Sequence, residues 1–176
     1  MVAALYDWDS IVEALLAAGA AVNYATPEGE DTALILAVAA DKDSVDDAAC
    51  LAVSKRLLAA GADVLASDSA GLSALIIAGI RDRLSLVDTL IEAGADVHAP
   101  AAAGFTAILL ACDSGRTSFV PRLLAAGADV NATVAGHGPP LALATLKGWG
   151  ATVEALVQHG ADVNHASGFP LSGSLY

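Results

Sequence analysis

The sequence repeats at a nearly constant interval, and this periodicity restricts the possible folds more than any other feature. An apolar segment that ends in a glycine recurs five times, at Gly19, Gly61, Gly94, Gly127 and Gly160. The successive spacings are 42, 33, 33 and 33 residues. A fixed period of 33 residues is typical of a solenoid, in which each unit buries its apolar surface against its neighbours.

A second apolar block keeps step with the first. Its copies are TALILA (32–37), SALIIA (73–78), TAILLA (106–111) and PPLALA (139–144). Each unit therefore predicts a short apolar helix, a polar break, a second helix and an extended turn. The recurring glycine suits the end of the second helix, because a left-handed residue closes the last turn there without a Cβ clash.

This arrangement resembles the ankyrin repeat family, whose unit is two antiparallel helices and a β-hairpin loop. The family carries Gly-x-Thr-Pro-Leu-His near the start of the unit and Gly-Ala-Asp-Val-Asn near its end, and the latter stands at 127–131 and 160–164. Thr32, Ser73 and Thr106 keep a hydroxyl that can cap the first helix. The resemblance implies an all-α repeat solenoid of stacked helix-turn-helix units with β-hairpin-like loops. It also implies a protein interaction module or scaffold without catalysis.

The repeat phasing predicts a single domain over residues 1–176. Its parts are a partial repeat (1–25), a repeat with nine excess residues (26–67), three regular repeats (68–100, 101–133, 134–166) and the start of a truncated repeat (167–176). Eight of the excess residues precede Gly61 in a segment, 44–60, without proline or glycine. We therefore predict a second helix there that is longer by about two turns, or roughly 12 Å. Ser10 and Ser44 are the predicted starts of the second helices in the first two units.

The composition favours a soluble intracellular protein. Hydrophobic residues make up 56% of the chain and the mean hydropathy is +0.61, which argues against disorder. Apolar runs such as 33–40 are shorter than the ~18 residues that a membrane-spanning helix needs. The first ten residues contain two aspartates and no basic residue, so they do not resemble a signal peptide. These features predict a cytoplasmic location.

The charge restricts the partners. A formal charge of −12 with only eight lysines and arginines argues against nucleic acid, because phosphate binding needs clustered cations. Residues 1–47 hold ten of the twenty acidic residues and one basic residue. We therefore expect any preference for a basic protein partner to lie in the amino-terminal third.

The recurring polar residues of the turns have a structural interpretation. Asp63, Asp96, Asp129 and Asp162 occupy one repeat position, where aspartate commonly binds its own local backbone. We interpret Asn23, Asn131 and Asn164 in the same way. The histidines His98, His137, His159 and His165 lack the spacing of a metal site, so no metal and no cofactor are predicted. Cys50 and Cys112 are interpreted as reduced, buried thiols.

One enzymatic alternative rests on two Asp-x-Asp-Ser stretches. LYDWDSIV (5–12) and VAADKDSV (38–45) superficially resemble the nucleophile motif of haloacid dehalogenase-type phosphatases. That chemistry needs the first aspartate, Asp7 or Asp41, at the end of a buried parallel strand, together with magnesium. Both stretches instead fall at the break between the two helices of a unit, where acidic residues favour a helix start. A magnesium-dependent phosphatase therefore stands only as a third hypothesis.

The partner-binding surface of a solenoid is usually the concave face formed by its loop tips and inner helices. By repeat position this face is predicted to contain Tyr6, Pro27, Glu28, Asp31, Ser69, Leu72, Ile80, Arg81, Phe105, Asp113, Ser114, Leu146, Lys147 and Trp149. Its apolar members either form a groove for a protein segment or pack into the stack. The first hypothesis is a protein interaction module that uses this face. The second is a self-associating or assembly-embedded structural element that uses its incomplete terminal repeats.

Overall fold

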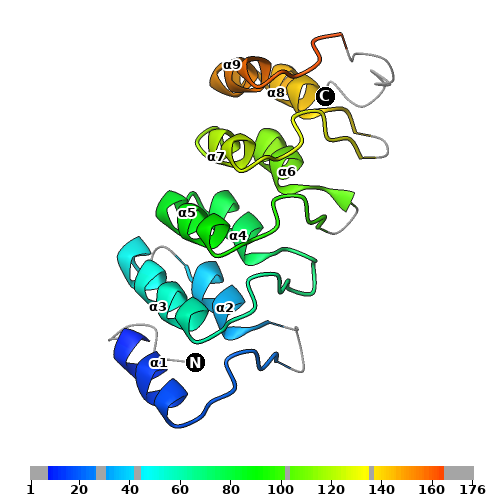
Figure 1. Cartoon of the computed structure of the whole chain (residues 1–176). Coiled ribbons are helices and arrows are strands. Elements are labelled where there is room, and N and C mark those ends of the chain that lie inside the picture. Colours follow the sequence, from blue (N-terminus) through cyan, green and yellow to red (C-terminus); the bar gives the residue numbers. More distant parts are fainter. Residues whose placement is uncertain (1–7, 27–30, 42–44, 102–103, 135–136, 165–176) are drawn as a thin grey trace.

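The protein is a stack of helix pairs whose connecting loops project to one side (Figure 1). The structure, a computed structural model, describes residues 8–26, 31–41, 45–101, 104–134 and 137–164. The inner helices are α2 (Ala33–Ala39), α4 (Ala74–Ile80), α6 (Ala107–Ser114) and α8 (Pro140–Lys147). The outer helices are α1 (Trp8–Ala17), α3 (Asp47–Ala59), α5 (Leu84–Glu92), α7 (Val120–Ala125) and α9 (Gly150–Gln158). The predicted all-α solenoid is confirmed.

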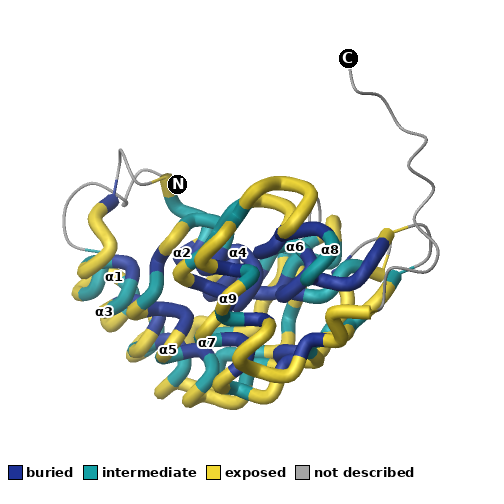
Figure 2. The backbone as a smooth tube through the Cα atoms, turned by 90° about the horizontal axis from the view of Figure 1, so that it is seen from above, coloured by how far each residue is buried: buried dark blue, intermediate teal, exposed yellow. Residues whose placement is uncertain are grey.

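The inner helices contact one another in succession, and each described inner helix also packs against the outer helix of its own pair. Buried residues lie where the two layers of helices face each other, whereas exposed residues follow the outer surface (Figure 2). The loops carry isolated antiparallel bridges, between Ser67 and Ser73 and between Val134 and His137. These bridges agree with the predicted hairpin-like form of the loops.

The recurring glycine ends each outer helix in the predicted conformation. At all five positions φ lies between +85° and +92°, in the left-handed region. The amide of the following residue then donates to a carbonyl at the last turn of the helix, as from Ala95 to Leu90 O (2.9 Å). A side chain would strain this backbone, so the glycine is a requirement of the fold and not of a site.

The helix starts follow the sequence only in part. The hydroxyls of Thr32 and Ser73 accept the amides of Ile35 (3.3 Å) and Ile76 (3.4 Å), as predicted. Thr106 makes no such bond, although it stands at the same repeat position. Helix α1 already includes Trp8, so Ser10 lies within it and is not its cap.

The predicted lengthening of the second outer helix is confirmed in direction. Helix α3 has 13 residues, against 9 in α5, 9 in α9 and 6 in α7, so it is longer by about one to two turns. The other extra residues belong to the connection before it, of which 42–44 lie outside the described residues. The helix starts later than Ser44 because the Asp46 carboxylate caps it, accepting the Ala49 amide at 2.6 Å.

Gly79 in α4 packs directly against the ring of Phe119, the residue before α7. A Cβ added at Gly79 would lie 2.0 Å from Cε1 of that ring, although φ at Gly79 is ordinary. The next repeats hold Cys112 and Thr145 at the position of Gly79, so the position itself tolerates a side chain. Glycine is required here because the buried Phe119 fills the space.

We therefore predict that Gly79→Ala lowers the free energy of unfolding by about 1–3 kcal/mol, the usual cost of overpacking a core. Gly150→Ala is the matched control, because a Cβ there meets nothing within 4 Å. Gly150 is the first residue of α9, where the helix preference for alanine is weaker than in the interior, so this variant should change the stability by less than about 0.5 kcal/mol. Urea unfolding followed by circular dichroism measures both changes. Equal stability of the two variants would contradict the packing argument.

Candidate partner-binding surface

The predicted surface residues divide by exposure. Tyr6, Pro27 and Glu28 lie outside the described residues. Five of the others are exposed: Ser69, Asp113, Ser114, Leu146 and Lys147. Six are half-buried: Asp31, Leu72, Ile80, Arg81, Phe105 and Trp149. The surface therefore mixes side chains that point into solvent with side chains that lie partly in the stack.

The four half-buried apolar or aromatic residues of this set all pack against the hydrophobic core. Phe105 also meets the imidazole of His137 edge to face, with ring centroids 4.6 Å apart. Trp149 covers Gly115 so closely that a Cβ there would lie 2.6 Å from the indole ring. These residues thus offer only part of their area to a partner, since the stack uses the rest.

Leu146 differs from them because its side chain is 69% exposed, the largest fraction among the large apolar residues of the described chain. It lies near the end of α8, at the same repeat position as Ile80 and Asp113. Next to it, Lys147 forms an ion pair with Asp113 of the preceding inner helix (3.1 Å). We name the row formed by Ile80, Asp113, Leu146 and Lys147 the inner-helix edge.

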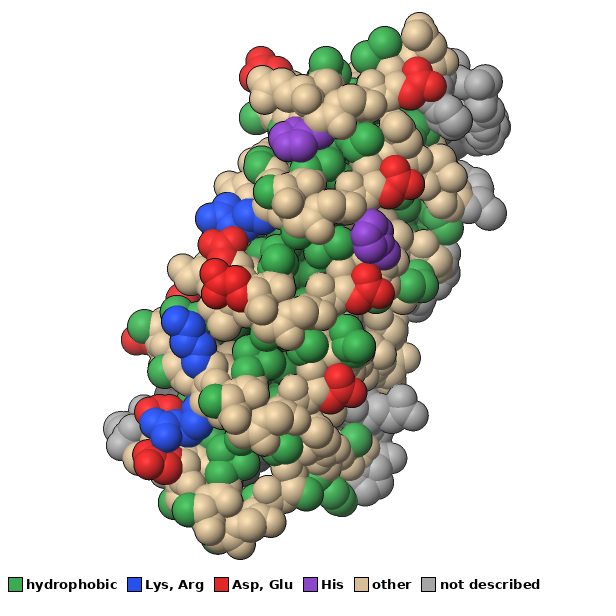
Figure 3. Space-filling model, in the orientation of Figure 1, with side chains coloured by type: hydrophobic (Ala, Val, Ile, Leu, Met, Phe, Trp, Pro, Cys, Tyr) green, Lys and Arg blue, Asp and Glu red, His purple; other side chains and the backbone are tan. Residues whose placement is uncertain are grey.

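Half of the basic residues form ion pairs between repeats, although three of these four are partly exposed. Every junction between described helix pairs contains an ion pair, and the cations are Arg56, Arg83, Arg122 and Lys147. In Figure 3 the basic side chains lie on the helical side, several beside acidic ones, whereas the side with the loops shows acidic side chains and no basic ones. The loop side is acidic because the paired basic side chains lie on the helical side, at the contacts between repeats.

The acid-rich amino-terminal segment is partly neutralised from elsewhere in the chain. Arg56 of α3 binds Asp9 through two bonds of 2.6 Å and lies 3.1 Å from Glu13. The hydrogen bond from Arg56 lowers the pKa of the Asp9 carboxyl. Asp47 likewise pairs with Arg83. Asp9, Glu13 and Asp47, all within residues 1–47, are therefore paired with cations of the same chain. The local excess of acid in the sequence therefore overstates the excess on the surface.

The turn aspartates behave as predicted. The Oδ1 atom of each accepts the backbone amide two residues further on, at 2.8–2.9 Å: Asp63 from Leu65, Asp96 from His98, Asp129 from Asn131 and Asp162 from Asn164. The interpretation of the asparagines needs correction, because two of them reach the next repeat and not their own turn. Asn23 accepts the Asp63 amide (2.8 Å) and Asn131 accepts the Asp162 amide (2.9 Å).

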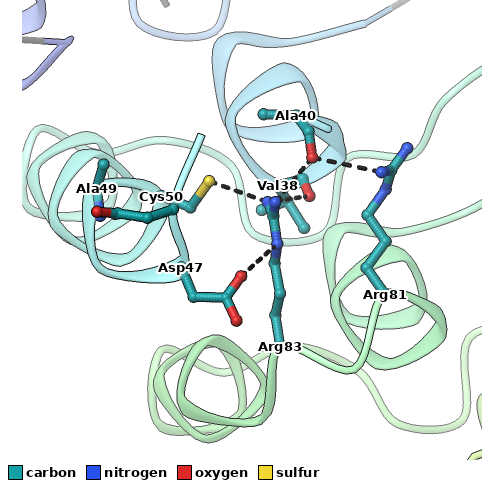
Figure 4. A network of polar contacts seen from close by, with 8 residues as sticks. Val38, Ala40, Asp47, Ala49, Cys50, Arg81 and Arg83 are labelled. Atoms are coloured by element: carbon teal, nitrogen blue, oxygen red, sulfur yellow. Dashed lines mark hydrogen bonds and ion pairs between the residues drawn. The ribbon is translucent and has the colours of Figure 1, made fainter. Parts of the chain in front are cut away.

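The sequence analysis missed the structural role of Arg83, which joins two repeats. It is 2% exposed and stands between α4 and α5. Its guanidinium donates to the carbonyls of Val38 (3.1 Å) and Ala40 (2.8 Å) and to Sγ of Cys50 (2.9 Å), and its Nε lies 3.0 Å from Asp47 Oδ1 (Figure 4). The contact with Asp47 is ionic and lacks hydrogen-bond geometry. One arginine thus joins the end of α2 and the start of α3 to the next repeat.

The two thiols are buried and harder to ionise than a free cysteine. Both cysteines are free and buried, as predicted. Burial raises the pKa of the Cys112 thiol to about 12. Burial also raises the pKa of Cys50, although the nearby Arg83 charge opposes the effect. A thiol with a raised pKa is a poor nucleophile at neutral pH.

The phosphatase motif lacks its required setting where the chain is described. Asp41 follows helix α2 and not a buried strand. Within the described residues no group of three or more His, Cys, Asp or Glu side chains could hold a metal ion. The same part of the chain contains no helix long and apolar enough to cross a membrane.

Comparison with protein families agrees with this architecture. The family model described as ankyrin repeats (3 copies) matches residues 1–101, 47–134 and 75–167. The chain therefore belongs to the ankyrin repeat family, whose members generally mediate protein–protein interaction and are typically not catalysts. No curated protein matched the sequence.

The buried position of Arg83 generates a stability prediction. Arg83→Met should lower the free energy of unfolding by about 2–4 kcal/mol, because it leaves buried carbonyls without donors. The matched control is Arg81→Met, which removes a half-buried arginine with a single bond of 3.3 Å to Ala40 O. It should cost less than about 1 kcal/mol. Denaturant unfolding measures the free energy of unfolding of both variants. Equal losses of stability would contradict the conclusion that Arg83 contributes more than Arg81.

The raised pKa of Cys112 predicts a loss of stability at alkaline pH. The unfolded thiol ionises near 9.0, whereas the folded thiol stays protonated to about 12. Between these values the unfolded state binds fewer protons, so the free energy of unfolding falls as pH rises, by up to about 1.4 kcal/mol per pH unit. Below pH 9 the contribution is complete. Cys112→Ala should show a shallower decline in urea titrations at pH 8–11, and an unchanged slope would contradict the assignment.

Proposed function

We propose that the protein binds another protein through its inner-helix edge and the adjoining loop tips, and that it performs no catalysis. The observation that carries the proposal is the exposure of Leu146 (69%) beside the Asp113–Lys147 ion pair. An exposed apolar side chain surrounded by charged groups is typical of the centre of a protein interface. Ile80 belongs to the same edge, and Phe105 and Trp149 of the predicted face would add the parts of their side chains that the stack leaves open.

The acidic loop side supports a partner segment with basic residues. The turn aspartates Asp63, Asp96, Asp129 and Asp162 are exposed along the stack. They recur once per repeat, so their charges add along one side of the molecule and attract a cationic segment at long range. Charge complementarity of this kind mainly raises the association rate, and it weakens as salt increases.

The proposal is tested with one substitution and a control of the same kind. Leu146→Glu should reduce the capture of bound proteins from native lysate at least tenfold, because a charged group replaces the apolar centre of the contact. The control is Leu65→Glu, which changes a leucine that is 61% exposed and lies in the turn after α3. Quantitative mass spectrometry compares the proteins retained by each variant and by the parent chain.

Proteins retained by the parent and the control but lost with Leu146→Glu are the expected result. Equal retention by all three chains would refute binding through the inner-helix edge. Circular dichroism of the variants checks that the helix content is unchanged, which is expected because both leucines are exposed. Retention that falls as salt rises from about 0.1 to 0.5 M would support the basic character of the partner.

A further inference from the structure

Arg116, in the turn between α6 and α7, differs from the other four arginines in its surroundings. Arg56, Arg81, Arg83 and Arg122 each donate from the guanidinium to an acid or to a backbone carbonyl. The side chain of Arg116 makes no hydrogen bond and no ion pair with any residue that the structure describes. The fold therefore does not use the hydrogen-bonding capacity of this cation.

The repeat position of Arg116 explains why it stays unpaired. Arg116 stands one repeat after Arg83, which donates to the carbonyl of Val38 near the end of α2 (3.1 Å). The counterpart of Val38 in the next repeat is Gly79, whose carbonyl accepts the amide of Asp82 (3.1 Å). Because this carbonyl is already bonded within the turn after α4, Arg116 does not repeat the contact that Arg83 makes.

The burial of Arg116 prepares its guanidinium for a group from outside the chain. The residue is half-buried, and its Nε atom is buried without a hydrogen-bond partner. The two Nη atoms also lack a partner, but they are open to solvent. A side chain held by its buried part loses less rotamer freedom on binding. Its two Nη groups can donate to both oxygens of one carboxylate.

Two contacts place Arg116 beside the inner-helix edge. Asp113, three residues before it, forms the ion pair with Lys147 (3.1 Å). Trp149 covers Gly115, the residue directly before Arg116, so that a Cβ at this glycine would lie 2.6 Å from the indole ring. These contacts hold the α8–α9 turn against the α6–α7 turn. A segment bound at the inner-helix edge can therefore also reach Arg116.

We propose that Arg116 binds a carboxylate of the partner segment that covers the inner-helix edge. The proposal rests on the proposed function and specifies its partner: an apolar side chain contacts Leu146, and an aspartate or glutamate close to it pairs with Arg116. Asp113, the acid of the edge, is already paired with Lys147 and so repels this carboxylate little. A phosphate would bring about twice the charge to a chain of formal charge −12, which favours the carboxylate.

The position of Arg116 also gives the partner segment a direction. The inner helices begin at the loops and end at the turns that lead to the outer helices. Helix α6 has eight residues and therefore spans about 12 Å between these two sides. The turn aspartates of the loop side attract basic residues, whereas Arg116 lies at the opposite end of the helix. The partner segment should carry its acidic residue over the helix turns and its basic residues over the loops.

The site is tested with two dipeptides that differ in a single group. N-acetyl-leucyl-glutamate amide carries the carboxylate, and N-acetyl-leucyl-glutamine amide is its uncharged control. Each is titrated into the full chain labelled with ¹⁵N in arginine, so that the Nε–Hε signals report binding by NMR. We expect the Arg116 signal to shift with saturation, and the glutamate dipeptide to bind at least about threefold more tightly than its control.

Chain variants assign this preference to Arg116. Arg116→Gln should remove the preference for the glutamate dipeptide. The matched control is Lys55→Gln, which removes the same charge from an exposed lysine of α3 and should leave the preference unchanged. Arg116→Lys keeps the charge but loses the two adjacent Nη groups, so the preference should fall at least about twofold. Circular dichroism of each variant checks that the helix content is that of the parent chain.

Three results would overturn the proposal. Equal binding of the two dipeptides, or a preference that Arg116→Gln leaves intact, would show that Arg116 is not a carboxylate site. Tighter binding of inorganic phosphate than of the glutamate dipeptide at Arg116 would show that the site takes a phosphate. None of these results depends on the capture experiment with Leu146→Glu. A failure of the Arg116 site is therefore distinguishable from a failure of the proposed function.

Discussion

The close stacking of the inner helices is the contact on which the rest of the structure depends. One repeat position of these helices is alanine throughout, and its side chains are 0–1% exposed: Ala37, Ala78, Ala111 and Ala144. A small side chain lets neighbouring helices approach closely, and larger residues one turn away then interlock. Because every unit contacts only its neighbours, this single contact, repeated, sets the shape of the whole molecule.

The polar contacts distinguish one junction from the next. Arg56 and Arg122 bind acids on the outer helices, Lys147 binds an acid on an inner helix, and Arg83 is buried among backbone carbonyls. An ion pair at the surface adds little to stability, but a buried arginine is costly to remove once its partners depend on it. Using cations in this way leaves the loop side acidic, and this links the internal packing to the kind of partner that we propose.

The fold could be predicted from the sequence because each local signal recurs with the same phase. Gly94 and Gly127 fit the left-handed helix ends, and Asp96 and Asp129 fit the turns, since these preferences act within a few residues. The predictions that failed concern helix starts, where more than one residue has the type of a cap. Helix α3 starts after Asp46, whose carboxylate caps it, and not at Ser44. Thr106 has the residue type of a cap without its bond.

The sequence by itself determined the class of fold and the ends of the outer helices, because a 33-residue period and its glycines restrict the backbone locally. It also determined that the chain is acidic. Only the tertiary structure decided which acids are neutralised, that Phe105 and Trp149 are half-buried while Leu146 is exposed, and that Arg83 is a core residue. The physical reason is that exposure and charge pairing depend on contacts between repeats. The periodicity predicts that such contacts exist, but it does not predict which residues make them.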